Sequence, residues 1–344
     1  MTTPLSPARI VLGDNNVWAL RLADARDGRG WLLIDAGVEA DRDAEVDAWA
    51  MTLEQARAHG FAPREVRAVI VTHEHIDHAA LAYRWAAEGA RIVVGRAGTQ
   101  AVVAGRTGLD AQRALRLHEY ERHGCPADVL ERLATWRGAR GATWEPCPRD
   151  AIDAADEHET WALADGRTLR LIAAPGHTPG NLVAWCEKER ALFSGDTLLP
   201  TTIPTPGLHF PGAVTGDLAA RRWPSLPPFL RSVAAVRVLA PAVVYPGHGE
   251  VMHDPLVYLD RFDAHHDRRA RQVRRHLAAH GASTAFEVTR ALFARLPAER
   301  LGQAMAEVIG HFDLLLERGE ATALVADTAA MRLQLEATHP GSQA

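Results

Sequence analysis

Short apolar stretches alternate with helix-like stretches along the first part of the chain. The runs Trp31–Ile34, Ala68–Val71 and Arg91–Gly95 have the length and composition of buried strands, and amphipathic stretches lie between them near residues 42–58 and 77–88. Strands that are separated by amphipathic helices are typical of a layered fold. The pattern therefore predicts an α/β architecture.

The pattern becomes helical over about residues 104–140, with a break at Gly124-Cys125-Pro126. Strand signals then return, and Asp165-Gly166 suits the tight turn of a hairpin. We expect this hairpin at 160–172, further strands at 182–186, 191–193 and 243–245, and an irregular loop at the Pro- and Gly-rich residues 200–212. Residues 104–140 are therefore predicted to form a helical insertion between two strand-rich halves.

From residue 255 the pattern is almost entirely helical. Helices are expected at 255–280, 284–295 and 300–318, followed by a short strand at 321–325. We therefore divide the chain into a catalytic domain at 1–254, a winged-helix-like helical unit at 255–330 and a tail at 331–344.

Composition narrows the classes of function. The chain of 344 residues has a formal net charge of -5, so no global basic field favours nucleic acid or an anionic membrane surface. The three cysteines form no CxxC pair, which favours a reduced, cytoplasmic protein. The amino terminus lacks the pattern of a signal peptide, and no apolar run is long enough to span a membrane.

The most informative segment is Thr72–His78, with the sequence THEHIDH. His73, His75, Asp77 and His78 place four candidate metal ligands within six positions, directly after a buried strand. The first two histidines would point apart on a helix, but they can converge in a tight loop. The spacing is also not that of a helical HExxH zinc site. We therefore expect a loop-borne metal site at the end of a strand.

Three later turns repeat this arrangement. Each follows a predicted strand, and each places a candidate ligand directly after a glycine, which permits a tight turn. These turns are PGHT with His177, SGDT with Asp196, and PGHG with His248.

The set of motifs resembles that of the metallo-β-lactamase superfamily. HEHIDH matches its HxHxDH motif, the three later turns resemble its remaining ligand motifs in order, and Asp35-Ala36-Gly37 resembles its early DTG-type motif with Ala36 in place of Thr. The resemblance covers about residues 10–250. It implies an αββα sandwich of two mixed sheets flanked by helices.

The resemblance also implies the role of each ligand. His73, His75 and His177 would bind one metal ion, Asp77, His78 and His248 a second, and Asp196 would bridge them. Imidazole and carboxylate ligands suit two Zn²⁺ ions, although iron or manganese would also fit such a shell. A hydroxide shared by the two ions would then be the nucleophile. The leaving group would be stabilised by one of the metal ions, or protonated through Asp77 or a bound water.

Other residues have weaker signals. Asp35, Thr72 and Thr197 are expected to hold the ligands in place by hydrogen bonds. We expect Glu74 to be solvated, and His118, His123, His209, His265 and His266 to be ordinary helix or loop residues. Trp18, Tyr120 and Phe210 are expected to serve packing rather than to line a substrate mouth. The five arginines of residues 268–275 are expected to form a solvated helix face.

These features favour a hydrolase that acts on a thioester or lactone of a small molecule. Asp196 stands where an antibiotic-degrading class B enzyme would be expected to have a cysteine ligand. The insert and the helical tail resemble a group that includes glyoxalase II-like and polyketide thioesterases and a single-strand-specific endoribonuclease. An endoribonuclease or phosphodiesterase and an iron-dependent sulfur dioxygenase are therefore the alternatives. The sequence leaves the oligomeric state open, a homodimer included.

Overall fold

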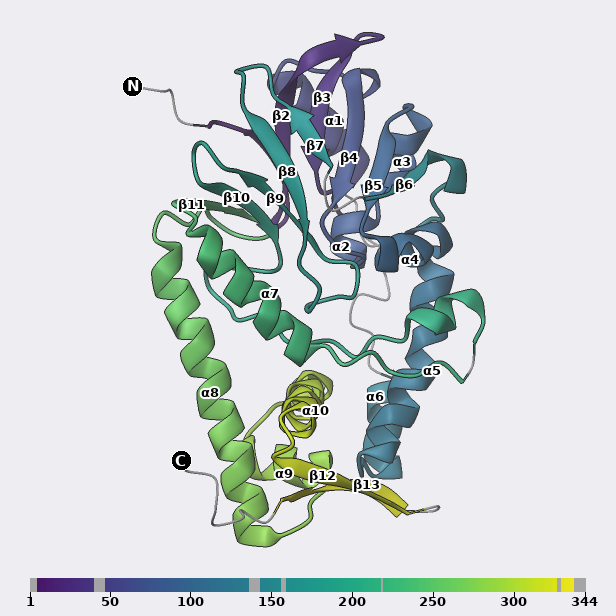
Figure 1. The fold of residues 1–344 in the computed structure, drawn as a ribbon. Helices are drawn as coiled ribbons and strands as arrows, with labels where there is room; N and C mark the ends of the chain where they lie inside the picture. The colour runs from purple at the N-terminus through teal and green to yellow at the C-terminus, as the bar shows by residue number, and fades with distance from the viewer. Residues whose placement is uncertain are drawn as a thin grey trace.

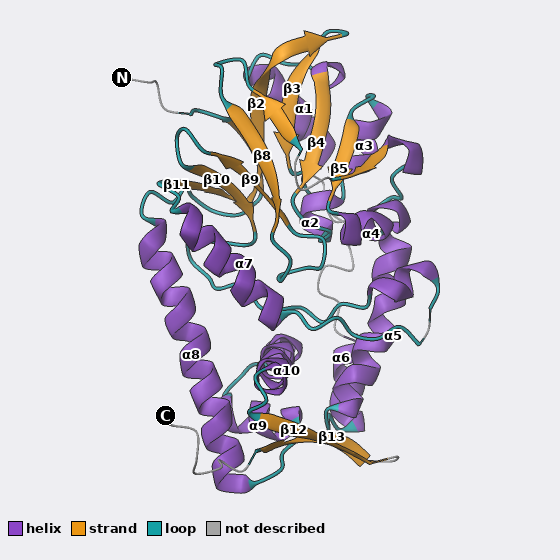
Figure 2. Ribbon diagram, in the orientation of Figure 1, coloured by secondary structure: helices purple, strands orange, loops and turns teal. Residues whose placement is uncertain are grey.

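The computed structural model describes residues 5–39, 47–135, 143–155, 159–217, 219–326 and 329–336. Two β-sheets lie face to face in the upper part of the molecule as Figure 1 draws it, and a largely helical region lies below them. Figure 2 shows the same division, with nearly all strands in the upper part.

The first sheet has six strands in the order β1-β2-β3-β4-β5-β6. Strands β1 to β3 are antiparallel, and β3 to β6 run parallel. The parallel part is built from the apolar runs that the sequence singled out. The strands are β1 (Ala8–Leu12), β2 (Asn15–Arg26), β3 (Arg29–Ile34), β4 (Val66–Val71), β5 (Arg91–Val94) and β6 (Ile152–Ala154).

The second sheet has five strands in the order β11-β10-β9-β8-β7. The hairpin of β7 and β8 turns at Asp165-Gly166, as predicted, and only β10 and β11 run parallel. The strands are β7 (Thr160–Ala162), β8 (Thr168–Ala173), β9 (Leu182–Cys186), β10 (Ala191–Gly195) and β11 (Val243–Pro246).

Alternation along the central strands explains the four layers. In β3, Leu33 packs against helices α1 (Ala48–Ala58) and α3 (Ala82–Ala87), whereas Leu32 and Ile34 face the second sheet. The far side of the second sheet is covered by α7 (Leu226–Leu239) and α8 (Pro255–His280). Helix, sheet, sheet and helix therefore follow one another, which confirms the αββα sandwich.

The helical insertion and the carboxy-terminal unit form the lower region (Figure 1). The predicted insertion contains α5 (Arg106–Arg122) and α6 (Ala127–Thr135), and α4 (Thr99–Ala104) leads into it. The carboxy-terminal unit contains α8, α9 (Ala285–Leu292), α10 (Leu301–Glu317) and the hairpin of β12 (Ala321–Ala326) and β13 (Ala329–Leu335).

The insertion and the carboxy-terminal unit share one hydrophobic core. Cys125 and Val129 of the insertion pack in the same cluster as Met305, Ile309 and Phe312 of α10. The predicted boundary at residue 254 therefore does not separate two independent cores.

A buried charge network reinforces this contact. Arg222 donates to Glu119 of α5 at 2.8 Å and forms two hydrogen bonds with Asp313 of α10, at 2.6 and 2.7 Å. His123 lies 3.2 Å from Glu119 and is fully buried, so it is not the ordinary helix-face residue that the sequence suggested.

The predicted helices of the carboxy-terminal unit are confirmed to within a few residues, because Pro255 begins α8 and a capping box of Thr284 and Glu287 begins α9. The tail expected from residue 331 is wrong in its first part, which pairs with β12 as β13. Three predicted parts lie outside the described residues: the start of the first helix at 42–46, the end of the insertion at 136–140, and the tail at 337–344. The winged-helix-like description stays a prediction. Among the described residues, no helix has both the length and the apolar character needed to cross a membrane.

Candidate metal centre

Four loops at the carboxyl ends of strands bring the seven predicted ligands together. The loop after β4 runs into the short helix α2 (Ile76–Ala79), and the other three loops follow β8, β10 and β11. Ligand atoms form three groups, each with all atoms within 4.8 Å of one another: His73, His75 and His177; His73, His78 and Asp196; and Asp77, His78 and His248. We refer to these side chains as the seven-residue cluster.

The first half of the cluster is a triangle of histidines. His75 Nδ1 lies 3.1 Å from His73 Nε2 and 3.0 Å from His177 Nε2. Two ring nitrogens at this distance can share only one proton, so lone pairs converge at the centre of the triangle. Such a centre suits a cation that accepts three nitrogen ligands.

The second half pairs two histidines with Asp77. His248 Nε2 lies 3.1 Å from His78 Nε2 and 3.3 Å from Asp77 Oδ2. Asp196 lies between the halves: its Oδ2 is 3.7 Å from His177 Nε2, and its Oδ1 is 3.4 Å from His78 Nε2. The two carboxylate oxygens of Asp196 therefore face different halves, as a bridging ligand would.

One carboxylate oxygen in the site lacks a hydrogen-bond donor in the described part of the chain, as an oxygen that coordinates a cation would. Asp196 Oδ1 is buried and accepts no hydrogen bond from the described residues. A buried carboxylate oxygen without a donor is costly, and coordination of a metal ion would satisfy it.

Asp35 orients a histidine in each half of the cluster. Its Oδ2 accepts from His78 Nδ1 at 2.9 Å, and its Oδ1 accepts from the Thr72 hydroxyl at 2.7 Å. Thr72 Oγ1 in turn lies 3.1 Å from His73 Nδ1. Both histidines are thereby held with Nε2 toward the centre. Asp35 and Thr72 thus lie where the sequence analysis expected them.

Among the described residues, Thr197 is connected to the cluster only through another side chain. Its hydroxyl accepts from Asn181 at 3.3 Å and makes no hydrogen bond to the seven-residue cluster. Asn181, which the sequence analysis did not single out, also accepts from the backbone N–H of Thr178, next to His177. The contact of Thr197 with a ligand is therefore indirect.

Glycine is required where the loops cross. A Cβ on Gly247 would lie 2.6 Å from His78 Cε1 and 2.7 Å from Asp196 Oδ1. Gly195 has a φ of +49°, and a Cβ there would lie 2.4 Å from the Thr72 hydroxyl oxygen. The glycines before Asp196 and His248 therefore permit the close backbone approach that the cluster needs.

Burial keeps the histidine triangle neutral. It lowers the pKa of His75 to about 3 and that of His177 to about 3, and it also lowers the pKa of His73; neighbouring histidines contribute in each case. Neutral imidazole is the form that binds a metal ion.

In the second half of the cluster, nearby carboxylates outweigh the effect of burial on the pKa of His78. Burial alone would lower the pKa of His78, but three carboxylates, led by Asp196, raise it to about 10. Burial acts to raise the pKa of Asp77, but His78 and His248 outweigh it and hold that pKa below its usual value. Asp77 is therefore ionised, and its side chain is the most exposed of those in the second half.

Two residues near the cluster were judged wrongly from the sequence. Glu74 is only partly exposed, and protein groups hold its carboxylate: it accepts from the Thr178 hydroxyl at 2.6 Å and from the Gly180 N–H at 3.1 Å, and burial raises its pKa. It therefore ties the first ligand loop to the loop that carries His177. The position of Glu74 between two histidines along the chain gave no sign that Thr178 and Gly180 would be its partners.

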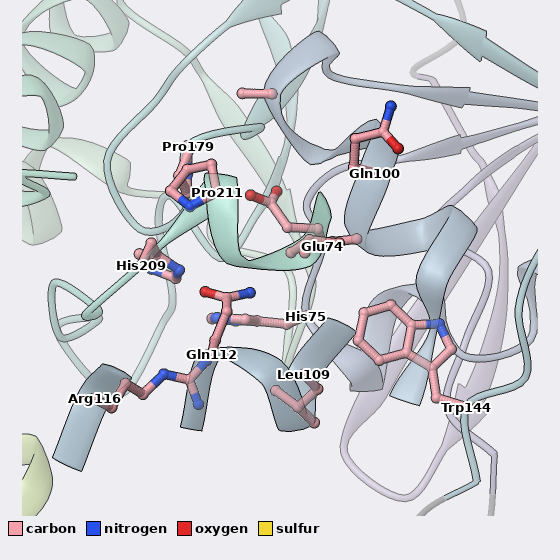
Figure 3. Close-up of a pocket in the computed structure, with 13 residues that line it drawn as sticks. Glu74, His75, Gln100, Leu109, Gln112, Arg116, Trp144, Pro179, His209 and Pro211 are labelled. Carbon is pink, nitrogen blue, oxygen red and sulfur yellow. The ribbon is translucent and has the colours of Figure 1, made fainter. Parts of the chain in front are cut away.

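His209 is the second of these residues. Its Nε2 lies 2.8 Å from the His177 carbonyl oxygen, and its ring stacks on His75 with centroids 5.9 Å apart. Figure 3 shows it beside His75, across a cavity from residues of α5. The Pro- and Gly-rich loop that carries His209 is thus part of the wall of the site.

The structure confirms the expected packing roles of Trp18, Phe210 and Tyr120. Trp18 is buried between the sheets and donates to the Pro246 carbonyl oxygen, and Phe210 lies in the core shared by the insertion and α10. Tyr120 packs against the same core and donates to the Gly302 carbonyl oxygen.

Comparison with known proteins agrees with the geometry. The profile of the metallo-β-lactamase superfamily matches residues 11–248. A probable metallo-hydrolase, YqjP, from Bacillus subtilis is 27% identical over 90% of each chain. An atrochrysone carboxyl ACP thioesterase from Aspergillus fumigatus is 28% identical over 39% of this chain and 41% of its own.

A solved structure shares the whole fold. A metallo-β-lactamase family protein from Thermus thermophilus superimposes with a TM-score of 0.71 at 23% identity, covering 96% of this chain and 98% of its own. With an αββα sandwich, ligand motifs in the expected order and a profile match over most of its length, this chain belongs to the metallo-β-lactamase superfamily of hydrolases.

Proposed function

We propose that the protein is a binuclear zinc hydrolase that cleaves a thioester or lactone of a small molecule. The observation that carries this proposal is the division of the seven-residue cluster into two groups, with one oxygen of Asp196 facing each. His73, His75 and His177 would hold one ion, and Asp77, His78 and His248 the other.

Two bound Zn²⁺ ions would supply the nucleophile by lowering the pKa of water, and would polarise the carbonyl group of the substrate. The protein's own part is orientation and proton transfer. Asp35 fixes the rings of His73 and His78, and Glu74 fixes the loop of His177. Asp77 is ionised and partly exposed, so it can accept a proton and pass it to the leaving group.

Two observations favour a small acyl substrate over a polynucleotide. The Aspergillus relative is named as a thioesterase, although it matches only part of each chain. Of the arginine run at residues 268–275, Arg269 is bound to Glu307 and Arg274 to Glu320. Arginines that are paired with acidic side chains are poorly placed to neutralise phosphates.

The test is metal quantification joined to an activity panel. We expect about two equivalents of zinc per chain, and hydrolysis of thioesters or lactones that stops on chelation and returns with zinc. Asp77→Asn should lower kcat by roughly 10²–10⁴-fold. Absence of turnover by the zinc-loaded protein on thioester, lactone and phosphodiester substrates would refute the proposal. Iron as the bound metal, or cleavage of single-stranded RNA, would favour one of the two alternatives.

A further inference from the structure

A cavity next to the histidine triangle is bordered by an arginine that has no acidic partner among the described residues. It is bordered by His75 on one side and by Gln112 and Arg116 of α5 on the other, as Figure 3 shows. We refer to it as the Arg116 cavity.

Arg116 makes one hydrogen bond with the described residues. Its Nε donates to the Leu208 carbonyl oxygen at 3.1 Å, and neither terminal nitrogen meets a carboxylate there. Burial lowers the pKa of the guanidinium. The Arg116 side chain is only partly exposed to solvent, and a cation in such a position that lacks an anion is costly for a fold to keep. An arginine without a carboxylate partner beside a reaction centre therefore points to an anion that arrives with a ligand.

The acidic side chain that borders the cavity does not fill this role. Glu74 borders the same cavity, but its two oxygens accept from Thr178 and Gly180, and it forms no ion pair with Arg116. The cavity therefore keeps its positive charge free for a ligand.

A neighbouring amide adds a second donor. Gln112 is buried, and its Oε1 accepts from the Phe210 N–H at 3.0 Å, which fixes the orientation of the amide. Its Nε2 makes no hydrogen bond within the described part of the chain. One turn of helix separates Gln112 from Arg116, so both sets of donors lie on one face of α5.

The size of the cavity limits the ligand group. The space open to the centre of a water molecule is about 40 Å³, and a single water needs at least ~10–15 Å³ by this measure. A compact group such as a carboxylate or a phosphate fits in place of a few waters.

We propose that the Arg116 cavity binds a terminal oxyanion on the acyl part of the substrate, while the thioester or lactone carbonyl lies at the seven-residue cluster. This rests on the proposed hydrolase function and narrows it to acyl groups that end in a carboxylate or phosphate. The planar guanidinium binds such oxyanions through two parallel hydrogen bonds, and Gln112 Nε2 adds a third donor.

The test compares matched thioesters on the zinc-loaded full chain. N-acetylcysteamine thioesters of succinate, glutarate and adipate are each compared with the corresponding terminal amide, which is nearly isosteric but neutral. We expect kcat/KM to favour the acid over the amide by about 10- to 100-fold at the best chain length, the range for hydrogen bonds to charged groups. A terminal phosphonate series shows whether the preferred oxyanion is carboxylate-like or phosphate-like.

Arg116→Gln should bring the acid-to-amide ratio toward one, and Arg116→Lys should give an intermediate ratio, because the charge remains but the two-pronged geometry is lost. The matched control is Arg113→Gln on the same helix. Arg113 also donates to a backbone carbonyl oxygen, that of Ala134, but does not border the cavity, so this variant should keep the wild-type ratio.

A ratio near one for every chain length in the wild type, or a ratio unchanged by Arg116→Gln, would overturn the proposal. Calorimetric titration with glutarate and with its neutral diamide, glutaramide, separates this failure from failure of the hydrolase function, since it needs no turnover. Tighter binding of glutarate that disappears in Arg116→Gln supports the anion site even if no thioester is cleaved. Equal binding of the two compounds contradicts it.

Discussion

Replacement of Asp35 by Asn tests whether one carboxylate keeps both halves of the metal site in order. Asp35 accepts from the His78 ring through one oxygen, and from the N–H and hydroxyl of Thr72 through the other. An ionised carboxylate only accepts, whereas an amide presents one acceptor and one donor. The amide of the Asp35→Asn variant would therefore point its NH₂ group at a donor in either orientation. The backbone is not the cause, because Asn tolerates the positive φ of +70° at this position.

The size of the effect follows from these contacts. A buried donor that loses its acceptor costs about 1–3 kcal/mol, and loss of a partner behind a metal-binding histidine typically weakens metal affinity by about 10- to 100-fold. These ranges agree, since a tenfold change in affinity is about 1.4 kcal/mol. We therefore expect zinc affinity in Asp35→Asn to fall by about 10- to 100-fold in the half that the misplaced donor faces, either that of His78 or, through Thr72, that of His73.

Competition with a chromophoric chelator measures this change and reports the two ions separately. The matched control is Asp14→Asn. Asp14 lies 3.5 Å from His248 Nδ1, but its side chain is 84% exposed, so the same loss of charge should change affinity little. Wild-type affinity for both ions in Asp35→Asn would refute the reasoning. An equal loss in both variants would show that charge, rather than the hydrogen bonds of Asp35, sets the affinity.

Three further substitutions test other parts of the structure. Gly247→Ala places a methyl group within 2.7 Å of two side chains of the seven-residue cluster, so zinc content measured by mass spectrometry should fall well below two equivalents. Glu74→Ala removes the acceptor of the Thr178 hydroxyl and of the Gly180 N–H, and should lower the free energy of unfolding in urea by about 1–3 kcal/mol; an unchanged value would contradict a role in joining the loops. Burial acts to raise the pKa of Glu119, but its hydrogen bond from a buried histidine and the charge of Arg222 lower it to about 2. Its stabilisation is therefore complete above about pH 4.5 and is lost as the pH falls toward 2, by roughly 3 kcal/mol at 1.36 kcal/mol per pKa unit. Urea unfolding of Glu119→Gln should show a flatter pH dependence than the wild type in this window, and parallel curves would contradict the assignment.

Much of the fold could be predicted because local patterns determine it. The runs at β3, β4 and β5 are apolar on both faces, as strands buried between helices and a second sheet must be. The limits of α8 follow from Pro255 and from Gly281, which has a φ of +72°. The strands β1, β2, β6 and β13 were not predicted, because most of them are short or lie toward sheet edges, where polar and apolar positions mix. Helix α7 was not predicted either.

The candidate site divides in the same way. The seven-residue cluster could be found because its members follow strand ends in recognisable motifs. Arg116, Gln112 and His209 could not, since they come from an insertion and an irregular loop whose meeting depends on tertiary packing. Glu74 was misjudged for a related reason, because its partners Thr178 and Gly180 lie more than 100 positions away.

The shared core of the insertion and α10 has a consequence for synthesis of the protein. Helix α10 is buried along most of its length, and Ile309 and Phe312 complete the apolar surface against which α5 and α6 rest. A nascent chain can pair all eleven strands of the sandwich once Pro246 has left the ribosome, but the helix that carries Arg116 still lacks its support. The wall of the cavity therefore becomes firm only when nearly the whole polypeptide has been made, and maturation of this region is a late folding event.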